Sequence, residues 1–142
     1  MKTSARNLFL GTVKECKRGA VNDEVHLELP GGARIVAIVT HESAERLGLK
    51  AGVAAVALVK ASSVIVATEL DGVRLSTRNQ LAGTVVSARP GAVNAEVVID
   101  IGGGATVAAI VTQPSLQSLA LKPGSKATAI FKASSVILGT GN

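Results

Sequence analysis

The sequence of 142 residues contains no tryptophan and no tyrosine, and its only aromatic side chains besides histidine are Phe9 and Phe131. Proteins that bind single-stranded nucleic acid without sequence preference normally stack bases on aromatic side chains. Both phenylalanines fall at apolar positions of predicted strands, and the net charge of +5 is dispersed along the chain. We therefore expect no nucleic-acid partner, and an OB-fold nucleic-acid-binding protein is kept only as an alternative.

Cysteine is nearly absent as well. The single Cys16 excludes an intramolecular disulfide and is typical of a reducing compartment. The sequence has no cluster of cysteine and histidine with the spacing of zinc ligands, so we expect no metal bound directly by protein side chains. It also lacks the glycine-rich loops that bind nucleotide phosphates, and we expect no cofactor.

Long apolar runs are missing too. No uninterrupted apolar stretch is long enough to cross a membrane, and residues 1–7 lack the apolar core of a signal peptide. We expect a cytoplasmic protein with no membrane partner. The 47% of residues that are hydrophobic are nearly all Ala, Val, Leu and Ile. Such side chains suit packed strands and close subunit contacts better than a spacious aromatic pocket.

What the sequence does contain is an internal duplication. Lys-Ala-Ser-Ser-Val-Ile occurs at residues 60–65 and again at 132–137, an offset of 72. At this offset residues 4–66 align with 76–138 without a gap, with 32 identities in 63 positions. Any function assigned to one copy must therefore be considered for the other.

The duplication predicts two domains, residues 1–68 and 76–142, joined by the polar linker 69–75. A unit of this size buries only about 60% of the surface of its unfolded chain and is marginally stable alone. Joining two copies, or association with other chains, would stabilise it.

Each copy has the pattern of five strands and one short helix. In the first copy, apolar and polar residues alternate over residues 24–29, which is typical of a half-buried strand. Pro30-Gly31-Gly32 predicts a hairpin turn, Thr40 can cap a short helix that Gly48 ends, and residues 63–68 predict the fifth strand. The order is that of a small OB-like barrel. The predicted fold class is all-β, with two tandem OB-like five-stranded antiparallel barrels and one short helix per repeat.

The histidines argue against catalysis. His26 aligns with Val98 and His41 aligns with Gln113, so neither is kept by both copies. We interpret His26 as a residue on an exposed strand face and His41 as a surface residue at a helix start.

The carboxylates lead to the same conclusion. Glu24 and Glu96, and likewise Glu28 and Asp100, occupy the polar face of a predicted strand. Carboxylates four apart on a strand are predicted to be solvated rather than to form a general acid–base pair. We expect that the protein is not an enzyme and has no catalytic residue.

Both copies keep a set of hydrogen-bond donors and cations. The set is Ser4/Ser76, Arg6/Arg78, Asn7/Asn79, Asn22/Asn94, Thr40/Thr112, Ser43/Ser115, Lys50/Lys122, Lys60/Lys132, Ser62/Ser134 and Ser63/Ser135. Hydroxyls, an arginine fork, a lysine charge and amides at turns can together bind an oxyanion. The alternative is that the serines and asparagines serve caps and turns while the cations are solvated.

At these residues the sequence resembles the molbindin family of small molybdate-binding proteins built from Mop (TOBE-type) domains. The resemblance rests on Ser-Ala-Arg-Asn, Gly-x-Val, Gly-Ala-Val-Asn-x-Glu-Val, the Gly-Gly hairpin, Ile-Val-Thr followed by Leu-Gly-Leu-Lys-x-Gly, and Lys-Ala-Ser-Ser-Val. The motifs occur in the same order in both copies, although the second copy departs from some of them. The tandem pair is similar to the two-domain molbindins.

The resemblance implies an OB-like barrel per repeat, a homotrimer, and molybdate or tungstate bound at domain interfaces for storage and homeostasis. The same domain occurs in molybdate-responsive regulators and transport ATPases. A ligand-sensing regulatory module that docks on a transporter or transcription factor is therefore a further alternative. The 142 residues contain no helix-turn-helix segment and no nucleotide motif, and we expect the domain to be the whole protein.

The resemblance also implies the site residues. A first main oxyanion-binding set comprises Ser4, Arg6, Thr40, Lys60, Ala61 and Ser62, and a second comprises Ser76, Arg78, Thr112, Lys132, Ala133 and Ser134. A second class of site is expected at Gly19, Ala20, Val21 and Asn22 and at Gly91, Ala92, Val93 and Asn94. The copies differ at Ala5 against Thr77 and at Glu42 against Pro114, so sites of the two copies are expected to differ in affinity.

Overall fold

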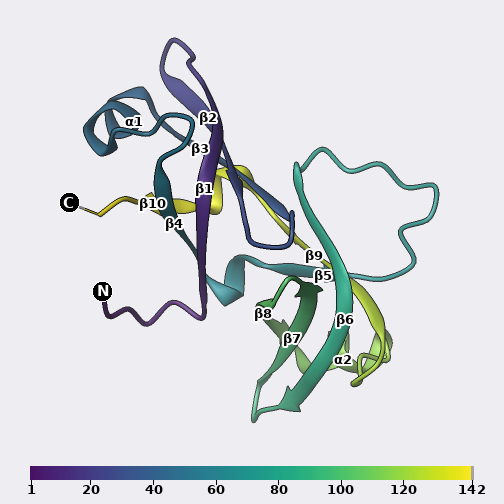
Figure 1. Ribbon diagram of the computed structural model, residues 1–142. Helices are drawn as coiled ribbons and strands as arrows, with labels where there is room; N and C mark the ends of the chain where they lie inside the picture. Colours follow the sequence, from purple (N-terminus) through teal and green to yellow (C-terminus); the bar gives the residue numbers. More distant parts are fainter. Residues whose placement is uncertain (142) are drawn as a thin grey trace.

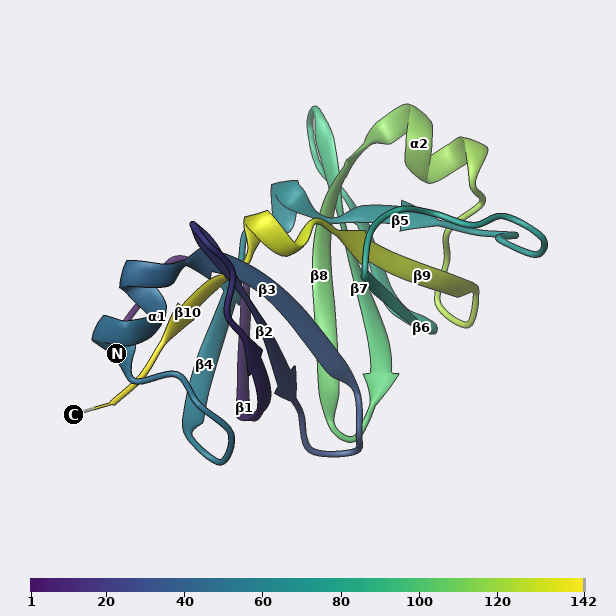
Figure 2. The same ribbon diagram turned by 90° about the horizontal axis from the view of Figure 1, so that it is seen from above.

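The computed structural model describes residues 1–141, and in this range the chain forms two five-stranded antiparallel sheets and two short α-helices (Figure 1, Figure 2). The first copy contributes β1 (Asn7–Lys17), β2 (Asn22–Glu28), β3 (Arg34–Thr40), α1 (His41–Leu47), β4 (Ala54–Val59), the 3-10 turn η1 (Ala61–Ser63) and β5 (Ile65–Ala67). The second contributes β6 (Asn79–Pro90), β7 (Asn94–Gly102), β8 (Ala105–Thr112), α2 (Gln113–Ser118), β9 (Lys126–Phe131), η2 (Ala133–Ser135) and β10 (Ile137–Gly139). The prediction of an all-β, OB-like fold with tandem repeats is confirmed.

The long strands β1 and β6 organise the two sheets. β1 pairs with β2 on one side and β4 on the other, and its register with β2 shifts between Val13 and Glu15; β6 repeats this arrangement. A Cβ atom added to Gly11 would lie 2.6 Å from the Glu28 carbonyl oxygen, and one added to Gly83 would lie 2.1 Å from that of Asp100. Glycine is required at this position of each copy because neighbouring backbone leaves no room for a side chain.

The fifth strands are exchanged between the copies. β5 pairs with β9 of the second copy, and β10 pairs with β4 of the first, so the sheet orders are β10-β4-β1-β2-β3 and β5-β9-β6-β7-β8. After η1 and after η2 the chain crosses to the other sheet, as Figure 2 shows near the centre of the molecule. Neither five-stranded sheet is therefore built from one repeat alone.

Two buried asparagines join the copies further. The Asn79 side chain donates to the Val36 carbonyl at 2.7 Å and accepts from the Val36 amide at 2.8 Å, while Asn7 makes the same pair of bonds to Ala108 at 2.8 and 2.7 Å. Each asparagine, at the start of β1 or β6, thus satisfies backbone groups of the other copy's third strand. Buried backbone groups are costly to leave unpaired, so these bonds fix how the copies dock.

The two hairpin turns also meet. A Cβ atom on Gly31, which has a φ of 95°, would lie 2.6 Å from the Gly103 Cα atom. Gly103 has a φ of 62°, and a Cβ atom added to it would clash in the same way with the Pro30 carbonyl oxygen. The glycines therefore serve close packing between the copies as well as the turn itself.

The apolar side chains of each sheet face inward to form the core. Phe9 and Phe131 are 4% and 1% exposed, as the apolar strand pattern predicts. Thr40 and Thr112 cap α1 and α2 by accepting from the amides of Ser43 and Ser115, which confirms the predicted helix start. Within residues 1–141, no helix has the length and apolar character that a membrane span requires.

Candidate functional site

The pairing of β1 with β4 creates the candidate site. Asn7 lies opposite Val59 at one end of this strand pair, so the segment before β1 and the turn after β4 leave the sheet side by side. Between them lies a pocket of about 600 Å³. Its lining includes Ser4, Arg6, Lys60, Ala61, Ser62 and Ser63 of the first copy together with Ile110, Ser134, Ser135 and Ile137 of the second. Five of the six residues of the first predicted set therefore share one pocket.

The turn that carries Lys60 presents both charge and amides. The Ser63 amide donates to the Lys60 carbonyl at 2.9 Å, which closes the 3-10 turn η1. The amides of Ala61 and Ser62 precede this bond, and the first amides of a helical turn have no carbonyl partner within it. Lys60 and Ser62 are exposed while Ala61 is 6% exposed. An anion in the pocket could therefore meet an ammonium group, a hydroxyl and backbone donors together.

Each predicted arginine contacts a glutamate of the other copy. Arg6 Nη1 lies 2.6 Å from Glu96 Oε2, and Arg78 Nη1 lies 2.8 Å from Glu24 Oε1. Both arginine side chains are more than half exposed, whereas both glutamates are only 21% exposed. These glutamates are therefore largely covered and ion-paired, and the expectation that they are solvated is wrong.

The side chains of Thr40 and Thr112 cap the N-termini of α1 and α2. The Thr40 hydroxyl donates to Ser43 Oγ at 2.8 Å and accepts from the Ser43 amide at 3.1 Å, and Thr112 makes the equivalent bonds to Ser115. Thr40 does not line the pocket around Lys60. It ends β3, which packs against η2 of the second copy, while β8, which Thr112 ends, packs against η1. Within one chain, each threonine thus ends a strand that packs against the 3-10 turn following the lysine of the other copy, which we call the lysine turn (η1 after Lys60, η2 after Lys132).

The second predicted set is not gathered in the same way. Ser76, Arg78, Lys132 and Ser134 are exposed and Ala133 is half-buried. Only Ser134 joins the pocket described above, where it faces the first set.

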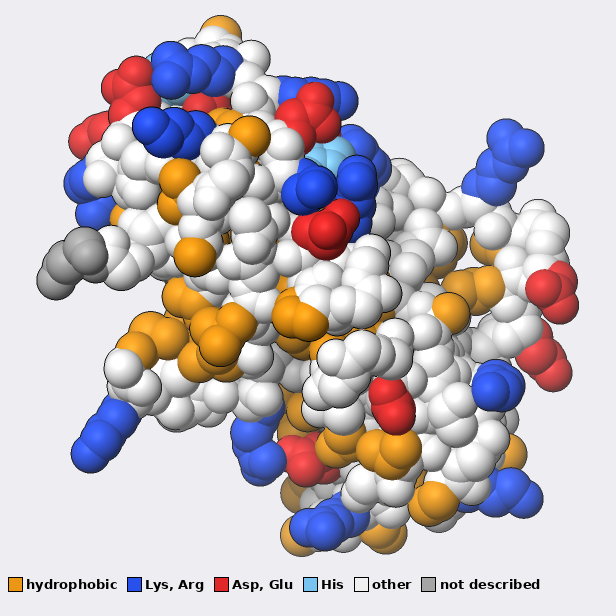
Figure 3. Space-filling model, viewed as in Figure 1, with side chains coloured by type: hydrophobic (Ala, Val, Ile, Leu, Met, Phe, Trp, Pro, Cys, Tyr) orange, Lys and Arg blue, Asp and Glu red, His pale blue; other side chains and the backbone are white. Residues whose placement is uncertain are grey.

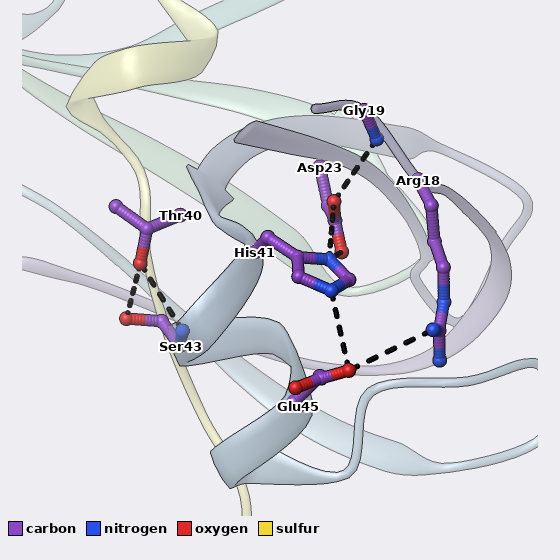
Figure 4. A network of polar contacts seen from close by, with 7 residues as sticks. All are labelled: Arg18, Gly19, Asp23, Thr40, His41, Ser43 and Glu45. Atoms are coloured by element: carbon purple, nitrogen blue, oxygen red, sulfur yellow. Dashed lines mark hydrogen bonds and ion pairs between the residues drawn. The ribbon is translucent and has the colours of Figure 1, made fainter. Parts of the chain in front are cut away.

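The loop of the predicted second-class site differs between the copies. In the first copy the Gly19 amide donates to Asp23 Oδ1 at 3.1 Å, and the His41 ring lies 3.1 Å from the same carboxylate and 3.2 Å from Glu45 (Figure 4). Arg18 approaches Glu45 at 3.7 Å. Burial tends to raise the pKa of Asp23, but the Gly19 amide, His41 and Arg18 outweigh it and hold this pKa below its ordinary value of 3.8.

The second copy has no counterpart of this network. Ala95 replaces Asp23, Gln117 replaces Glu45, and Gln113, in the place of His41, donates to the Gly91 carbonyl. The loop of the second copy thus carries no buried carboxylate. In the first copy the Asp23 carboxylate accepts a hydrogen bond from the Gly19 amide, so this amide already has a partner. A dianion is disfavoured near buried negative charge, so the two loops differ in their suitability for an anion.

Two features were missed by the sequence interpretation. His26 is 8% exposed rather than on an exposed face, and its ring lies 2.6 Å from Glu24 Oε2, which also faces Arg78. Asn7 and Asn79 were recognised as shared by the copies but not as the groups that join them. The only signal was that both asparagines were retained directly after the arginines.

Among residues 1–141, no group of three His, Cys, Asp or Glu side chains is arranged to hold a metal ion. The gathered donors are hydroxyls, amides and cations, which are suited to an oxygen-rich anion rather than to a cation.

The fold and the duplicated donor set define a tandem domain of a known class: the chain belongs to the TOBE domain family, which matches residues 3–66 and 75–138. A solved structure of similar fold is that of the cytoplasmic molybdate-binding protein ModG with molybdate bound. It is 51% identical to this chain, has a TM-score of 0.96, and the match covers 99% of this chain and 100% of ModG.

Curated relatives show the same relationship. The molybdenum-pterin-binding protein MopA of Rhodobacter capsulatus is 44% identical over 138 residues, and the molybdenum transport protein ModE of Azotobacter vinelandii is 46% identical over 138 residues. Each match covers 97% of this chain but 52% and 51% of the relatives, so the chain spans about half the length of these proteins. By their names, MopA binds molybdenum-pterin and ModE is a molybdenum transport protein.

Proposed function

We propose that this protein binds molybdate, and also tungstate, in the cytoplasm for storage and homeostasis, without catalysing a reaction. The observation that carries the proposal is the pocket that gathers Ser4, Arg6, Lys60, Ala61 and Ser62. The names of ModG and MopA support molybdate as the ligand.

The chemistry of the pocket fits a tetrahedral dianion. Lys60 and Arg6 supply positive charge, although Arg6 also faces Glu96 at 2.6 Å. Hydroxyls and turn amides can satisfy the remaining oxygen lone pairs. Hydrogen bonds to charged groups contribute about 1.5–3 kcal/mol each. Loss of Arg6 or Lys60 is therefore expected to weaken binding by about tenfold or more, because 1.4 kcal/mol corresponds to a factor of ten.

The exposure of the pocket supports sites that are completed between chains. Hydrophobic side chains gather on the face seen in Figure 3, around the ends of β1 and β4 from which the N-terminal segment leaves. Ile65 and Ile137 are 63% and 62% exposed, and Val21 and Val93 are 72% and 75% exposed. Because the same positions are exposed in both copies, we propose that they are covered by further copies of the chain in a homotrimer.

The proposed organisation keeps residues 1–68 and 76–142 as the two domains, with 69–75 as the linker, but with the fifth strands exchanged. Both sets of main-site residues and both Gly-Ala-Val-Asn loops remain proposed oxyanion sites. Burial of Phe9 and Phe131 leaves neither aromatic ring available for base stacking, which argues against the nucleic-acid alternative.

The test is calorimetric titration of the purified protein with molybdate, tungstate and sulfate. We expect tight binding of the first two and much weaker binding of sulfate, with Arg6→Ala and Lys60→Ala weakened about tenfold or more. Light scattering should find three chains per particle. Heat for molybdate no larger than for sulfate would contradict the proposed specificity.

A further inference from the structure

The contacts between arginines and glutamates are equivalent in position but unequal in geometry. Arg78 uses two nitrogens: Nη1 lies 2.8 Å from Glu24 Oε1 and Nη2 lies 3.3 Å from Oε2, both with hydrogen-bond geometry. Arg6 uses one nitrogen, Nη1, at 2.6 Å from Glu96 Oε2. The direction of that approach is not that of a hydrogen bond, and Glu96 Oε2 is a buried atom without a hydrogen-bond partner among the described residues.

A histidine present in only one copy explains the inequality. Glu24 and His26 are two residues apart on β2, so their side chains share a face of the strand. The His26 ring nitrogen lies 2.6 Å from Glu24 Oε2, and it must be the donor because an ionised carboxylate only accepts. The hydrogen bond from His26, followed by that from Arg78, holds the pKa of Glu24 below its ordinary value of 4.5 despite burial.

The second copy lacks this donor. Val98 occupies the position of His26, and its side chain cannot donate to Glu96. The Glu96 carboxylate is therefore held by fewer groups and meets its arginine at only one oxygen.

We propose that His26 is a positioning residue that makes the two arginines unequal anion ligands. By orienting Glu24 it retains Arg78 in a two-nitrogen ion pair, whereas Arg6 contacts Glu96 through one nitrogen without hydrogen-bond geometry and turns more readily towards an oxyanion. The inference rests on the proposed function and deepens it: the Arg6 site fills first, and the Arg78 site binds more weakly because the anion must compete with Glu24.

The first measurement needs no ligand. Nitrogen-15 NMR of the guanidinium groups should show slow exchange and restricted rotation for Arg78 and faster exchange for Arg6. His26→Val places the second copy's residue in the first copy. In this variant the exchange and rotation of the Arg78 guanidinium should become as fast as those of Arg6. Val98→His should slow Arg6. Cys16→Ala, an equivalent exchange to the second copy's residue on neighbouring β1, is the control and should change neither arginine.

The second measurement isolates each site. In Arg6→Ala protein, adding His26→Val should strengthen molybdate binding at the remaining Arg78 site by about threefold to tenfold, within the range for half-exposed charge pairs and charge-assisted bonds. In Arg78→Ala protein, adding Val98→His should weaken binding at the Arg6 site by a similar factor.

The outcomes separate the two ideas. Molybdate binding that is intact but equal at the two sites, together with arginine exchange that His26→Val leaves unchanged, would overturn this inference alone. Failure of every variant and of the wild-type protein to bind molybdate would overturn the proposed function as well.

Discussion

The two copies agree in their backbone and differ in the polar groups that support it. Both have the register shift in the first strand, the glycine that lets the second strand approach, the threonine-capped helix and the 3-10 turn after the fourth strand. The first copy alone adds the Asp23–His41–Glu45 network and the His26–Glu24 bond. The duplication has thus kept the framework of the site while its electrostatic surroundings have diverged.

This difference shows which groups the fold requires. Asn7 and Asn79 are present in both copies because each closes hydrogen bonds that the other copy's sheet cannot close itself. His41 can be replaced by a glutamine that makes a different bond to the same loop. Groups that join the copies are therefore expected to matter more for stability than groups within one copy.

Removal of an inter-copy asparagine should have the largest effect. In Asn79→Ala, the buried Val36 amide and carbonyl lose their partners, and we expect a loss of about 2–4 kcal/mol in the free energy of unfolding. Asn7→Ala should lose less, because its bonds are only partly buried. Urea unfolding measures both, with the exposed Asn94→Ala as the control, which should change stability by less than about 0.5 kcal/mol. An Asn79→Ala protein as stable as the control would show that the docking of the copies does not depend on this side chain.

The helix ends offer a smaller, reciprocal comparison. Gly48 ends α1 with a φ of 67°, and Ala120 follows α2 with a φ of 50°, a conformation that alanine disfavours. Space around a Cβ at Gly48 is open, so Gly48→Ala tests the backbone alone and should cost about 1 kcal/mol. Ala120→Gly should stabilise the protein by up to about 1 kcal/mol, which thermal unfolding would detect. Changes of the same sign in both variants would contradict this account.

The sequence predicted most of the fold because its signals are local. Strand alternation, the Gly-Gly hairpin and the threonine cap depend on neighbouring residues, and all three are found in the structure. The exchanged fifth strands were not predicted, since β5 and β10 have the same apolar pattern whichever sheet they join.

The candidate site shows the same limit. Ser4, Arg6 and the lysine turn were predicted by motif, and the pairing of β1 with β4 places them together. The partners Glu96 and Glu24 could not be predicted, because each lies in the other copy and reaches its arginine only through the docking of the two sheets.

The smallest expected effect is a pH dependence that belongs to the first copy. The pKa of Asp23 is lower in the folded protein than its ordinary value of 3.8, so the unfolded chain binds a proton more readily. The ionised Asp23 carboxylate therefore stabilises the folded protein fully above the unfolded pKa. This stabilisation is lost as the pH falls through the folded pKa. Asp23→Ala, which gives the first copy the residue of the second, should flatten the fall in the urea midpoint below about pH 4. Asp23→Asn keeps a hydrogen-bond acceptor for the Gly19 amide but no charge, and it should flatten the curve equally. If the asparagine variant kept the full wild-type pH dependence, the charge of Asp23 would not be its source.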